Sequence, residues 1–329
     1  MTGVREAGAI AVVVVGFNHH GWLAECLGSA LGGRPEHRRL DVYFVDNAST
    51  DGSVEFVRAR FPAVHVIANA RNRGFTGGCN QALRRVLATD AEYVMLLNPD
   101  TVCPAGMLDA LAAFLDAHPS YGIVGPLQYR YPGDGMTGHN EWTVAALRQG
   151  EEHVFAADWP DRPSPAGPRD GRAPGTLEHA YVQGSALFTR TALLRRTGLF
   201  DEGYHSYYEE VDLCRRARWA GWRVALLLDL GIFHAGGGGG DSRYRRVHLI
   251  RNRLYYLFTD PDWPLPAAVR LAARWLRRDV RGRGVAGPVG PLTGAADTVV
   301  ALVRLAPLIG SIVRRRRAHR ALARTGGSG

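Results

Sequence analysis

Short apolar runs alternate with stretches of helical periodicity through residues 9–97. The first run, Ala9–Val15, is continuous and rich in β-branched residues, which is typical of a strand buried in a parallel sheet. Further strands are predicted at 41–46, 64–67 and 93–97, and helices at 22–31, 54–60 and 77–87. This alternation predicts a right-handed parallel α/β sheet that binds ligands at the carboxyl ends of its strands, where the polar turns lie.

The pattern becomes less regular after residue 100. Strands are predicted at 123–126, 181–188 and 224–228, and helices at 104–118 and 210–220. The segment 159–175 holds five prolines and three glycines, which predicts a long irregular loop. A run of five glycines, Gly236–Gly240, follows the strand predicted at 224–228 and is a candidate mobile lid.

From Pro264 onward the pattern is helical and rich in arginine. Helices are predicted at 269–279 and 298–313, and Pro307 is expected to kink or break the second of them. We therefore predict a catalytic domain over 1–258, with a donor half at about 1–120 and an acceptor half at about 121–258. A basic helical extension over 259–329 follows it.

Charge separates the two parts further. The net charge is +9, and residues 265–329 carry 13 arginines against Asp279 and Asp297, an excess of +11, which leaves 9 − 11 = −2 for the rest. An apolar, basic helical tail predicts peripheral contact with an anionic membrane surface, and we expect no nucleic-acid partner. A solvated helical subdomain packed on the core is the alternative interpretation.

The cysteines and the apolar stretches of the sequence bear on the cellular compartment of the protein. The four cysteines form no CxxC pair, which favours buried thiols in a reducing compartment. No export signal is visible, and no stretch of about 18 uncharged apolar residues occurs, so no spanning helix is expected. These features predict a cytoplasmic protein, associated with the inner face of the membrane through its tail.

Two polar segments of the first half are candidates for nucleotide binding. Asp46 and Asn47 follow the strand at 41–46, where a carboxylate can accept hydrogen bonds from a nucleobase or ribose, although an Asx-turn that caps the next helix has the same composition. The glycine-rich segment 72–80 opens a helix, where backbone N–H groups and Arg73 favour a phosphate. This segment is not GxGxxG and does not follow the first strand, which argues against a dinucleotide-binding dehydrogenase.

Three further side chains are candidates for a metal site. Asn98 and Asp100 lie two residues apart after the strand at 93–97, which suits a hard divalent cation already held by a diphosphate. Asp100 is equally compatible with a helix N-cap. His234 lies after the strand predicted at 224–228 and is a candidate ligand of the same cation, although a lone histidine is more often structural.

Three acids open the helix predicted at 210–220. Glu209, Glu210 and Asp212 suit the helix dipole, and they also suit a general base, because neighbouring carboxylates raise each other's pKa toward neutrality.

The order of these segments resembles the family 2 glycosyltransferases, most of all their rhamnosyltransferase-type branch. The resemblance covers residues 9–258 and rests on Val12–Val15, 46–53, 72–75, Asn98–Asp100, Gly184–Ser185, Phe200–Glu202, Glu209–Leu213 and His234. It implies a GT-A fold, in which a mostly parallel twisted sheet is flanked by helices, and an inverting single displacement.

The resemblance also implies roles for individual residues. Asp46, with Asn47 beside it, would contact the base or ribose. The nucleotide site would be lined by the loop that contains Asn72, Arg73, Gly74 and Gly77.

For the chemistry itself, the resemblance places Asn98 and Asp100 at the family's DXD position. Asp100 would bind Mg²⁺ or Mn²⁺ with His234 as a further ligand, and Asn98 stands where the first Asp is usual. Glu210 falls on the position of the catalytic base, where an Asp is usual, and Glu209 precedes it as the alternative base.

We therefore predict an inverting glycosyltransferase whose donor is a nucleotide-diphosphate sugar, either thymidine-diphosphate rhamnose or a UDP-sugar. The acceptor is a lipid-linked glycan, which fits the basic tail, or a natural product, for which the 159–175 loop would act as a lid. The alternatives are a sugar-phosphate nucleotidyltransferase, disfavoured because no glycine-rich basic loop follows the first strand, and a non-catalytic membrane-binding scaffold.

Overall fold

The computed structural model describes residues 8–130, 173, 175–235, 242–284 and 288–326. Most of the proline-rich segment 159–175 and the whole glycine run Gly236–Gly240 lie outside these residues, so the two lids predicted there are not described.

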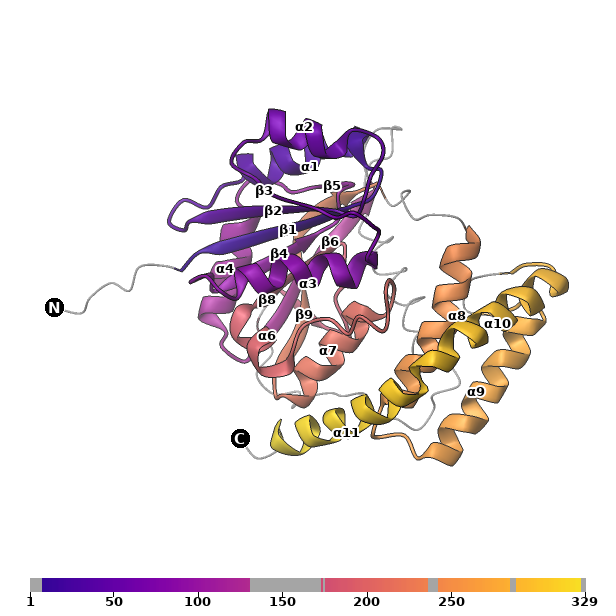
Figure 1. The fold of residues 1–329 in the computed structure, drawn as a ribbon. Helices are drawn as coiled ribbons and strands as arrows, with labels where there is room; N and C mark the ends of the chain where they lie inside the picture. Colours follow the sequence, from indigo (N-terminus) through magenta and orange to yellow (C-terminus); the bar gives the residue numbers. More distant parts are fainter. Residues whose placement is uncertain (1–7, 131–172, 174, 236–241, 285–287, 327–329) are drawn as a thin grey trace.

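The first half of the chain forms the predicted parallel strands and helices (Figure 1). The strands are β1 (Ile10–Gly16), β2 (Leu40–Asp46), β3 (His65–Ala68) and β4 (Tyr93–Leu97). The helices are α1 (His20–Gly32), α2 (Ser53–Arg60), α3 (Gly74–Val86) and α4 (Met107–Ala117). All four strands pair in parallel, in the order β3-β2-β1-β4.

The second half continues the same sheet with mixed directions. Its strands are β5 (Thr101–Val102), β6 (Tyr121–Arg130), β7 (Thr176–Glu178), β8 (Ala186–Arg190) and β9 (Arg223–His234), and its helices α6 (Thr191–Thr197) and α7 (Glu209–Trp219). Beyond β4 the order is β8-β6-β9-β5. Strand β8 is antiparallel to both β4 and β6, whereas β6 and β9 run parallel to each other. Within the described residues the sheet is therefore mostly parallel in direction, as predicted, with β5, β7 and β8 reversed.

Two predicted strands have different bounds in the structure. The strand expected at 181–188 begins only at Ala186, because Gly184 and Ser185 form a turn and Tyr181 is a buried part of the loop. The strand expected at 224–228 extends to His234. In its pairing with β6, Leu227 lies opposite Pro126, but the next residue of β6, Leu127, lies opposite Gly231. The residues of β9 between Leu227 and Gly231 therefore form a bulge, and the strand continues beyond it.

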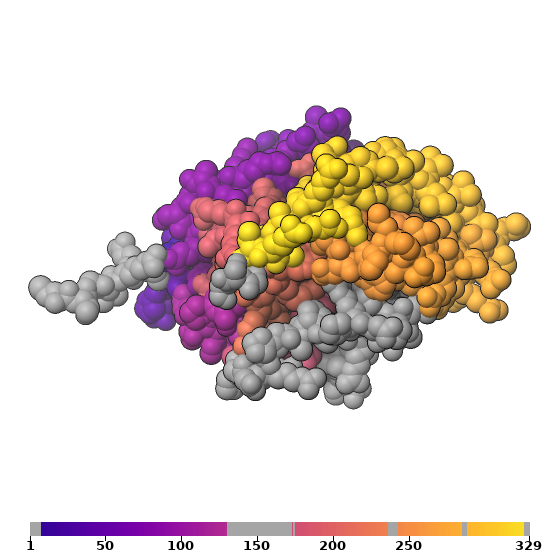
Figure 2. All heavy atoms as spheres, turned by 90° about the horizontal axis from the view of Figure 1, so that it is seen from below, coloured from indigo at the N-terminus to yellow at the C-terminus, as the bar shows by residue number. Residues whose placement is uncertain are grey.

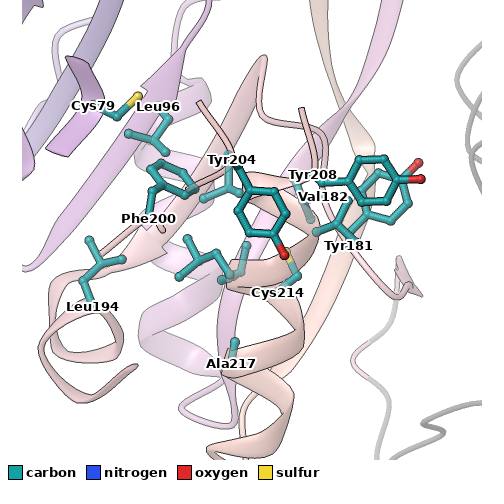
Figure 3. Close-up of a cluster of buried hydrophobic side chains, with 14 of the residues drawn as sticks. Cys79, Leu96, Tyr181, Val182, Leu194, Phe200, Tyr204, Tyr208, Cys214 and Ala217 are labelled. Atoms are coloured by element: carbon teal, nitrogen blue, oxygen red, sulfur yellow. The ribbon is translucent and has the colours of Figure 1, made fainter. Parts of the chain in front are cut away.

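Alternate residues of β1 face two separate cores, one on each side of the sheet. Val13 and Val15 pack with α3 and α7, whereas Val12 and Val14 pack with α1 and α4. Figure 3 shows part of the first core, where Cys79 of α3, Leu96 of β4 and Cys214 of α7 converge. All four cysteines are buried and free, as predicted. Each fully buried aliphatic side chain contributes about 1.5–3 kcal/mol, so both layers of helices are held on the sheet.

The C-terminal part is a bundle of helices at one end of the molecule (Figures 1 and 2). It contains α8 (Ser242–Thr259), α9 (Leu265–Val280), α10 (Pro291–Leu305), a 3₁₀ turn at Ala306–Leu308, and α11 (Ile309–Gly326). The predicted break at Pro307 is the 3₁₀ turn, so the helix expected at 298–313 divides between α10 and α11. Helix α8 was not predicted, because its buried Arg251, Asn252 and Arg253 obscure the apolar face of the pattern.

The expectation of no spanning helix meets one candidate in this part, by length and composition alone. Among the described residues, the helical run 291–325 is long and apolar enough to cross a membrane by length and composition, with a mean hydropathy of 1.7 over 18 residues. The sequence criterion missed it because Arg304 interrupts the uncharged stretch. Only 22% of that window is buried, so most of its apolar surface faces outward.

Helix α8 joins the extension to the catalytic domain. On one side, Arg253 forms a buried ion pair with Asp279 at 2.6 Å, and Arg246 pairs with Asp297 at 2.6 Å. On the other side, the Asn252 amide donates to three carbonyls of the loop 204–207, at 2.6–3.0 Å. The predicted division at 258/259 therefore falls at the end of a helix that contacts both parts.

Candidate active site

The predicted site residues meet at one edge of the sheet. Strands β1, β2 and β4 end there, and β9 ends there too, because it runs in the same direction. The short strand β5 follows β4 and pairs antiparallel with the end of β9, placing Thr101 opposite His234. This pairing brings the Asn98–Asp100 segment next to His234, which lies more than a hundred residues further along the chain.

The candidate metal ligands are in contact. His234 Nε2 lies 3.3 Å from Asp100 Oδ1 and 3.5 Å from Asn98 Nδ2. Burial acts to raise the pKa of Asp100, but the hydrogen bond and charge of His234 outweigh it and hold that pKa below its usual value. Among the described residues no group of three His, Cys, Asp or Glu side chains could hold a metal alone. One carboxylate and one imidazole fit a cation whose remaining ligands come from a diphosphate and water.

Gln128 contacts the Nδ1 side of His234. Its amide nitrogen donates to Ser185 Oγ, so its oxygen faces His234 Nδ1 at 3.2 Å and accepts the proton there. With Nδ1 facing Gln128, His234 directs Nε2 at Asp100, and a cation bound between the two side chains would take the place of the proton that they share. Gln128 is buried, and sequence analysis missed it. The only signal was a polar residue just past the strand predicted at 123–126.

The end of β2 presents an acceptor for a ligand. Asp46 is buried, and its Oδ2 accepts a hydrogen bond from the Ser49 N–H at 2.9 Å. Its Oδ1 is buried without a hydrogen-bond partner in the described structure. Leaving a buried acceptor unpaired costs about 1–3 kcal/mol, so this oxygen is positioned for a ligand donor rather than for folding.

The glycine-rich loop fits the predicted phosphate cradle less well. Two N–H groups at the start of α3 are already used: the Gly74 N–H by Asn72 Oδ1 at 2.8 Å, and the Thr76 N–H by the His205 carbonyl at 3.1 Å. Gly77 is buried, and a Cβ there would meet the Arg73 side chain at 2.9 Å, so it is a packing glycine.

The other residues of that loop, and those that contact it, either support its conformation or are exposed to solvent. Gly74 has φ +71°, and a Cβ there would overlap the His205 ring. Asn47 donates to the Gly74 carbonyl at 3.0 Å and accepts from Asn69 at 3.1 Å, so its side chain braces the loop. Arg73 is exposed on the rim and is the member of the loop best placed to reach a phosphate.

Glu209 and Glu210 begin α7 as a coupled carboxyl pair. Burial, together with the neighbouring Glu210, raises the pKa of Glu209 well above its ordinary value. Burial raises the pKa of Glu210 to about 7, where backbone N–H groups at the start of α7 and the Glu209 side chain limit the rise. Two neighbouring buried carboxyls whose pKa values are both raised share a proton near neutral pH, and Glu210 is the candidate for the member that ionises. Glu210 is also the more exposed of the two.

The loop before this pair is strained and is held by α8. His205, Tyr207 and Tyr208 all have positive φ, between 66° and 74°. Such conformations cost about 1–3 kcal/mol each and persist only where the surroundings impose them. Asn252 of α8 supplies that constraint through its three carbonyl contacts. Tyr208 belongs to the core that Figure 3 shows in part, and its ring lies 5.8 Å from that of Tyr256 on α8.

Comparison with known proteins supports the resemblance. The family model described as glycosyl transferase family 2 matches residues 11–195, which is more than half of the chain. The chain belongs to glycosyl transferase family 2. The match includes β1 to β8 and all the donor-side candidates.

Two curated relatives are glycosyltransferases. The N-acetylglucosaminyl-diphospho-decaprenol L-rhamnosyltransferase of Mycobacterium tuberculosis is 29% identical over 206 residues, covering 60% of this chain and 67% of the relative. The low-salt glycan biosynthesis hexosyltransferase Agl10 of Haloferax volcanii is 24% identical over 165 residues, covering 47% of this chain and 46% of the relative.

Solved structures share the GT-A fold. The mannosyltransferase PcManGT of Pyrobaculum calidifontis, in complex with GDP-Man and Mn²⁺, aligns at TM-score 0.55 and 20% identity, covering 97% of this chain and 84% of that one. TarS of S. aureus, in complex with UDP-GlcNAc, aligns at TM-score 0.53 and 17% identity, covering 96% and 91%.

One acid of the α7 motif of this glycosyltransferase is structural rather than catalytic. Asp212 is buried and pairs with Arg215 at 2.6 Å and Arg216 at 2.8 Å, both of them buried. Burial alone would raise the pKa of Asp212, but the two guanidinium groups hold it well below its usual range. The pair of arginines in turn reaches backbone carbonyls of the loop 197–199 and of Tyr256.

Replacing Asp212 with alanine is expected to destabilise the glycosyltransferase by about 3–5 kcal/mol, because buried Arg216 loses its counter-charge and buried Arg215 keeps only Asp260, at 3.6 Å. Urea unfolding followed by circular dichroism measures this. Asp90→Ala removes an exposed ion pair with Arg39 and is the control, with an expected change below about 1 kcal/mol. Equal losses in the two variants would contradict the structural role of Asp212.

Gln128→Leu is expected to weaken Mn²⁺ binding by about 10- to 100-fold, since His234 loses the acceptor that keeps its proton on Nδ1. Mn²⁺ titration by electron paramagnetic resonance, in the presence of a nucleoside diphosphate, measures it. Gln128→Glu keeps an oxygen facing His234 and should retain affinity close to that of the wild type. Wild-type affinity in Gln128→Leu would show that the amide does not orient the ring.

Proposed function

We propose that this glycosyltransferase moves a sugar from a nucleotide-diphosphate sugar to an acceptor hydroxyl with inversion, assisted by a divalent cation. The observation that carries the proposal is the arrangement at the carboxyl edge of the sheet. Asp100 and His234 meet there as a cation site, and the loop before β8 links this site to the base, since Ser185 contacts Gln128 while Gly184 lies against the Glu209–Glu210 pair.

Asp100 and His234 would hold Mg²⁺ or Mn²⁺, with Asn98 beside them. When bound, the cation would neutralise charge that develops on the departing diphosphate. Solved neighbours contain Mn²⁺ together with a nucleotide or nucleotide sugar, which supports this assignment. The unpaired Asp46 oxygen would receive a hydrogen bond from the base or ribose, and Arg73 would approach the phosphates from the rim.

Glu210 would act as the general base. Its carboxylate takes the proton of the acceptor hydroxyl while that oxygen bonds to the anomeric carbon, and the bond from this carbon to the diphosphate oxygen breaks. Attack from the face opposite the leaving group inverts the sugar in one step. A protonated Glu209 would donate a hydrogen bond to Glu210 and stabilise its ionised form.

Thymidine-diphosphate rhamnose is the proposed donor, supported by the name of the mycobacterial relative, and a UDP-sugar is the second candidate. A lipid-linked glycan is the proposed acceptor for the same reason, in preference to a natural product. This acceptor would place the enzyme at the inner face of the cytoplasmic membrane. The nucleotidyltransferase and the inert scaffold are not favoured, because the family match covers the donor side of the site.

Calorimetry with thymidine diphosphate, UDP and GDP, each with and without Mn²⁺, tests the donor class. Metal-dependent binding of one nucleotide, followed by transfer of its sugar with inversion seen by nuclear magnetic resonance, is the expected result. Absence of binding to all three nucleotides would refute the donor-site assignment. Retention at the anomeric carbon would refute the single displacement.

A further inference from the structure

We propose that the outer surface of α9, α10 and α11 lies flat on an anionic lipid bilayer, with apolar side chains in the interface and arginines at the headgroups. This inference rests on the proposed function only in expecting the acceptor to be membrane-borne. The surface itself is argued from exposure, charge and packing.

Exposed apolar side chains concentrate in the extension. Of the eleven large hydrophobic residues that are exposed in the described structure, all but Phe17 and Leu228 lie within residues 265–313. They are Leu265, Val269, Val280, Leu292, Val299, Leu302, Val303, Ile309 and Val313. Scattered exposed hydrophobic residues are ordinary, but a concentration of this kind marks an interaction surface.

Their spacing places them in stripes along the helices. On α10, Leu292, Val299 and Val303 follow intervals of seven and four residues, and they are 88%, 60% and 67% exposed. On α9, Leu265 and Val269 lie four residues apart, and Val280 follows eleven residues later. Such intervals return to one side of a helix, so each helix carries an apolar stripe that no described part of the chain covers.

The charge of the same surface is of one sign. Asp279 and Asp297, the two acids among residues 265–329, are buried at 3% and 1% exposure and face α8. Within residues 265–326 the exposed charged side chains are therefore all arginines, among them Arg270 and Arg277 on α9 and Arg281 directly after it. An apolar stripe flanked by arginines is the pattern of a helix that lies in the headgroup region of a bilayer.

The packing of α11 argues against a crossing of the bilayer. Although 291–325 has the length of a spanning helix, α11 is fastened to the catalytic domain. Arg315 pairs with Asp201 at 3.0 Å, and Tyr255 contacts Ser311 at 3.1 Å. His319 is buried with its Nδ1 3.0 Å from the Thr259 carbonyl. Insertion of 291–325 across a membrane would break all of these contacts.

A bilayer fits this surface better than a second copy of the chain. Two copies that met through it would bring their arginines together, and like charges in contact oppose association. Phosphate headgroups supply the opposite charge, at about 1 kcal/mol for each arginine near the surface. Burial of the valine and leucine side chains among the acyl chains is favourable, because it removes their apolar surface from water.

Co-sedimentation of the full chain with vesicles, without donor or acceptor, tests the proposal. Binding is expected to vesicles of phosphatidylcholine mixed with phosphatidylglycerol and to be much weaker for phosphatidylcholine alone. Val299→Ser/Val303→Ser should lower the partition coefficient about tenfold for each valine. Arg270→Gln/Arg277→Gln/Arg281→Gln should lower it about fivefold for each arginine.

Controls separate this surface from net charge and from catalysis. Arg34→Gln/Arg58→Gln/Arg60→Gln removes the same charge from exposed positions of the catalytic domain and should leave binding within about twofold. Equal loss in the two arginine variants would overturn the surface assignment, as would vesicle binding unaffected by the valine variant. If the enzyme transfers sugar but does not bind vesicles, the surface is wrong and the proposed function stands. If the protein binds vesicles but transfers no sugar, the surface assignment stands and the proposed function is wrong.

Two further results would identify another occupant. A dimer in sedimentation velocity that Val299→Ser/Val303→Ser dissociates, without vesicle binding, would assign the surface to a second copy. Retention of the protein in membranes after washing with alkaline carbonate would show a spanning helix in place of a surface contact. Release by this wash is the expected result.

Discussion

Glu210→Gln is expected to lower kcat by about a thousandfold while leaving nucleotide binding unchanged, because the variant cannot take the proton of the acceptor hydroxyl. The amide has nearly the same shape as the carboxyl, so a loss of this size would report chemistry rather than folding. Steady-state transfer and calorimetric nucleotide binding, measured on the same preparation, check both parts.

The pH profile of the wild type tests the same assignment. Because burial raises the pKa of Glu210 to about 7 and only the ionised form accepts a proton, kcat should fall about tenfold for each pH unit below 7 and level off above it. Removing the carboxyl in Glu210→Gln should abolish that limb in the residual activity.

Glu209→Gln is the matched control. Burial and the neighbouring Glu210 raise the pKa of Glu209 and so favour its neutral form, which a neutral amide resembles, and kcat should change by less than about tenfold. If Glu209→Gln lost a thousandfold while Glu210→Gln kept its activity, Glu209 would be the base instead.

Asp100→Ala is expected to remove the effect of Mn²⁺ on nucleotide binding, with a loss of affinity of about 100-fold, or about 2.7 kcal/mol, in the presence of the ion. The physical reason is that Asp100 supplies the carboxylate ligand of the cation site that it forms with His234. Calorimetry with and without Mn²⁺ measures both affinities, and metal-free binding should match that of the wild type.

Two companion variants sharpen this result. Asp46→Ala should weaken nucleotide binding equally with and without Mn²⁺, because the unpaired Asp46 oxygen is placed for the base or ribose and not for the ion. Asn98→Asp should tighten Mn²⁺ binding, since it adds a second carboxylate beside His234. Full Mn²⁺ dependence in Asp100→Ala would remove this residue from the metal site.

The donor half was predictable because its strands are continuous apolar runs bounded by polar turns. The sequence predictions for β1, β2, β3 and β4 differ from the observed strands by at most one residue at either end. Local pattern and global fold agree there, since both faces of these strands are buried. Asp46, Asp100 and the Glu209–Glu210 pair were predicted because they follow such strands or open a helix.

The contacts around the site were less predictable, because they depend on how distant segments pair. The bulge that carries β9 on to His234 leaves no local signature, and neither does the reversal of β8. Gln128 became significant only through its neighbours Ser185, in the turn before β8, and His234, at the end of β9. Asp212 has the same sequence context as the two glutamates, yet its side chain meets Arg215 and Arg216 instead of the site.

The position of α8 also has a consequence for how the chain folds. Arg253 and Arg246 are neutralised by Asp279 and Asp297 of the extension, and Asn252 of the same helix fixes the strained loop before the catalytic pair. Detachment of α9 and α10 would leave two arginines without their counter-charges, at a cost of several kcal/mol. The extension and the acceptor half therefore form one cooperative folding unit, in which the geometry of the base is completed only when the last helices have docked.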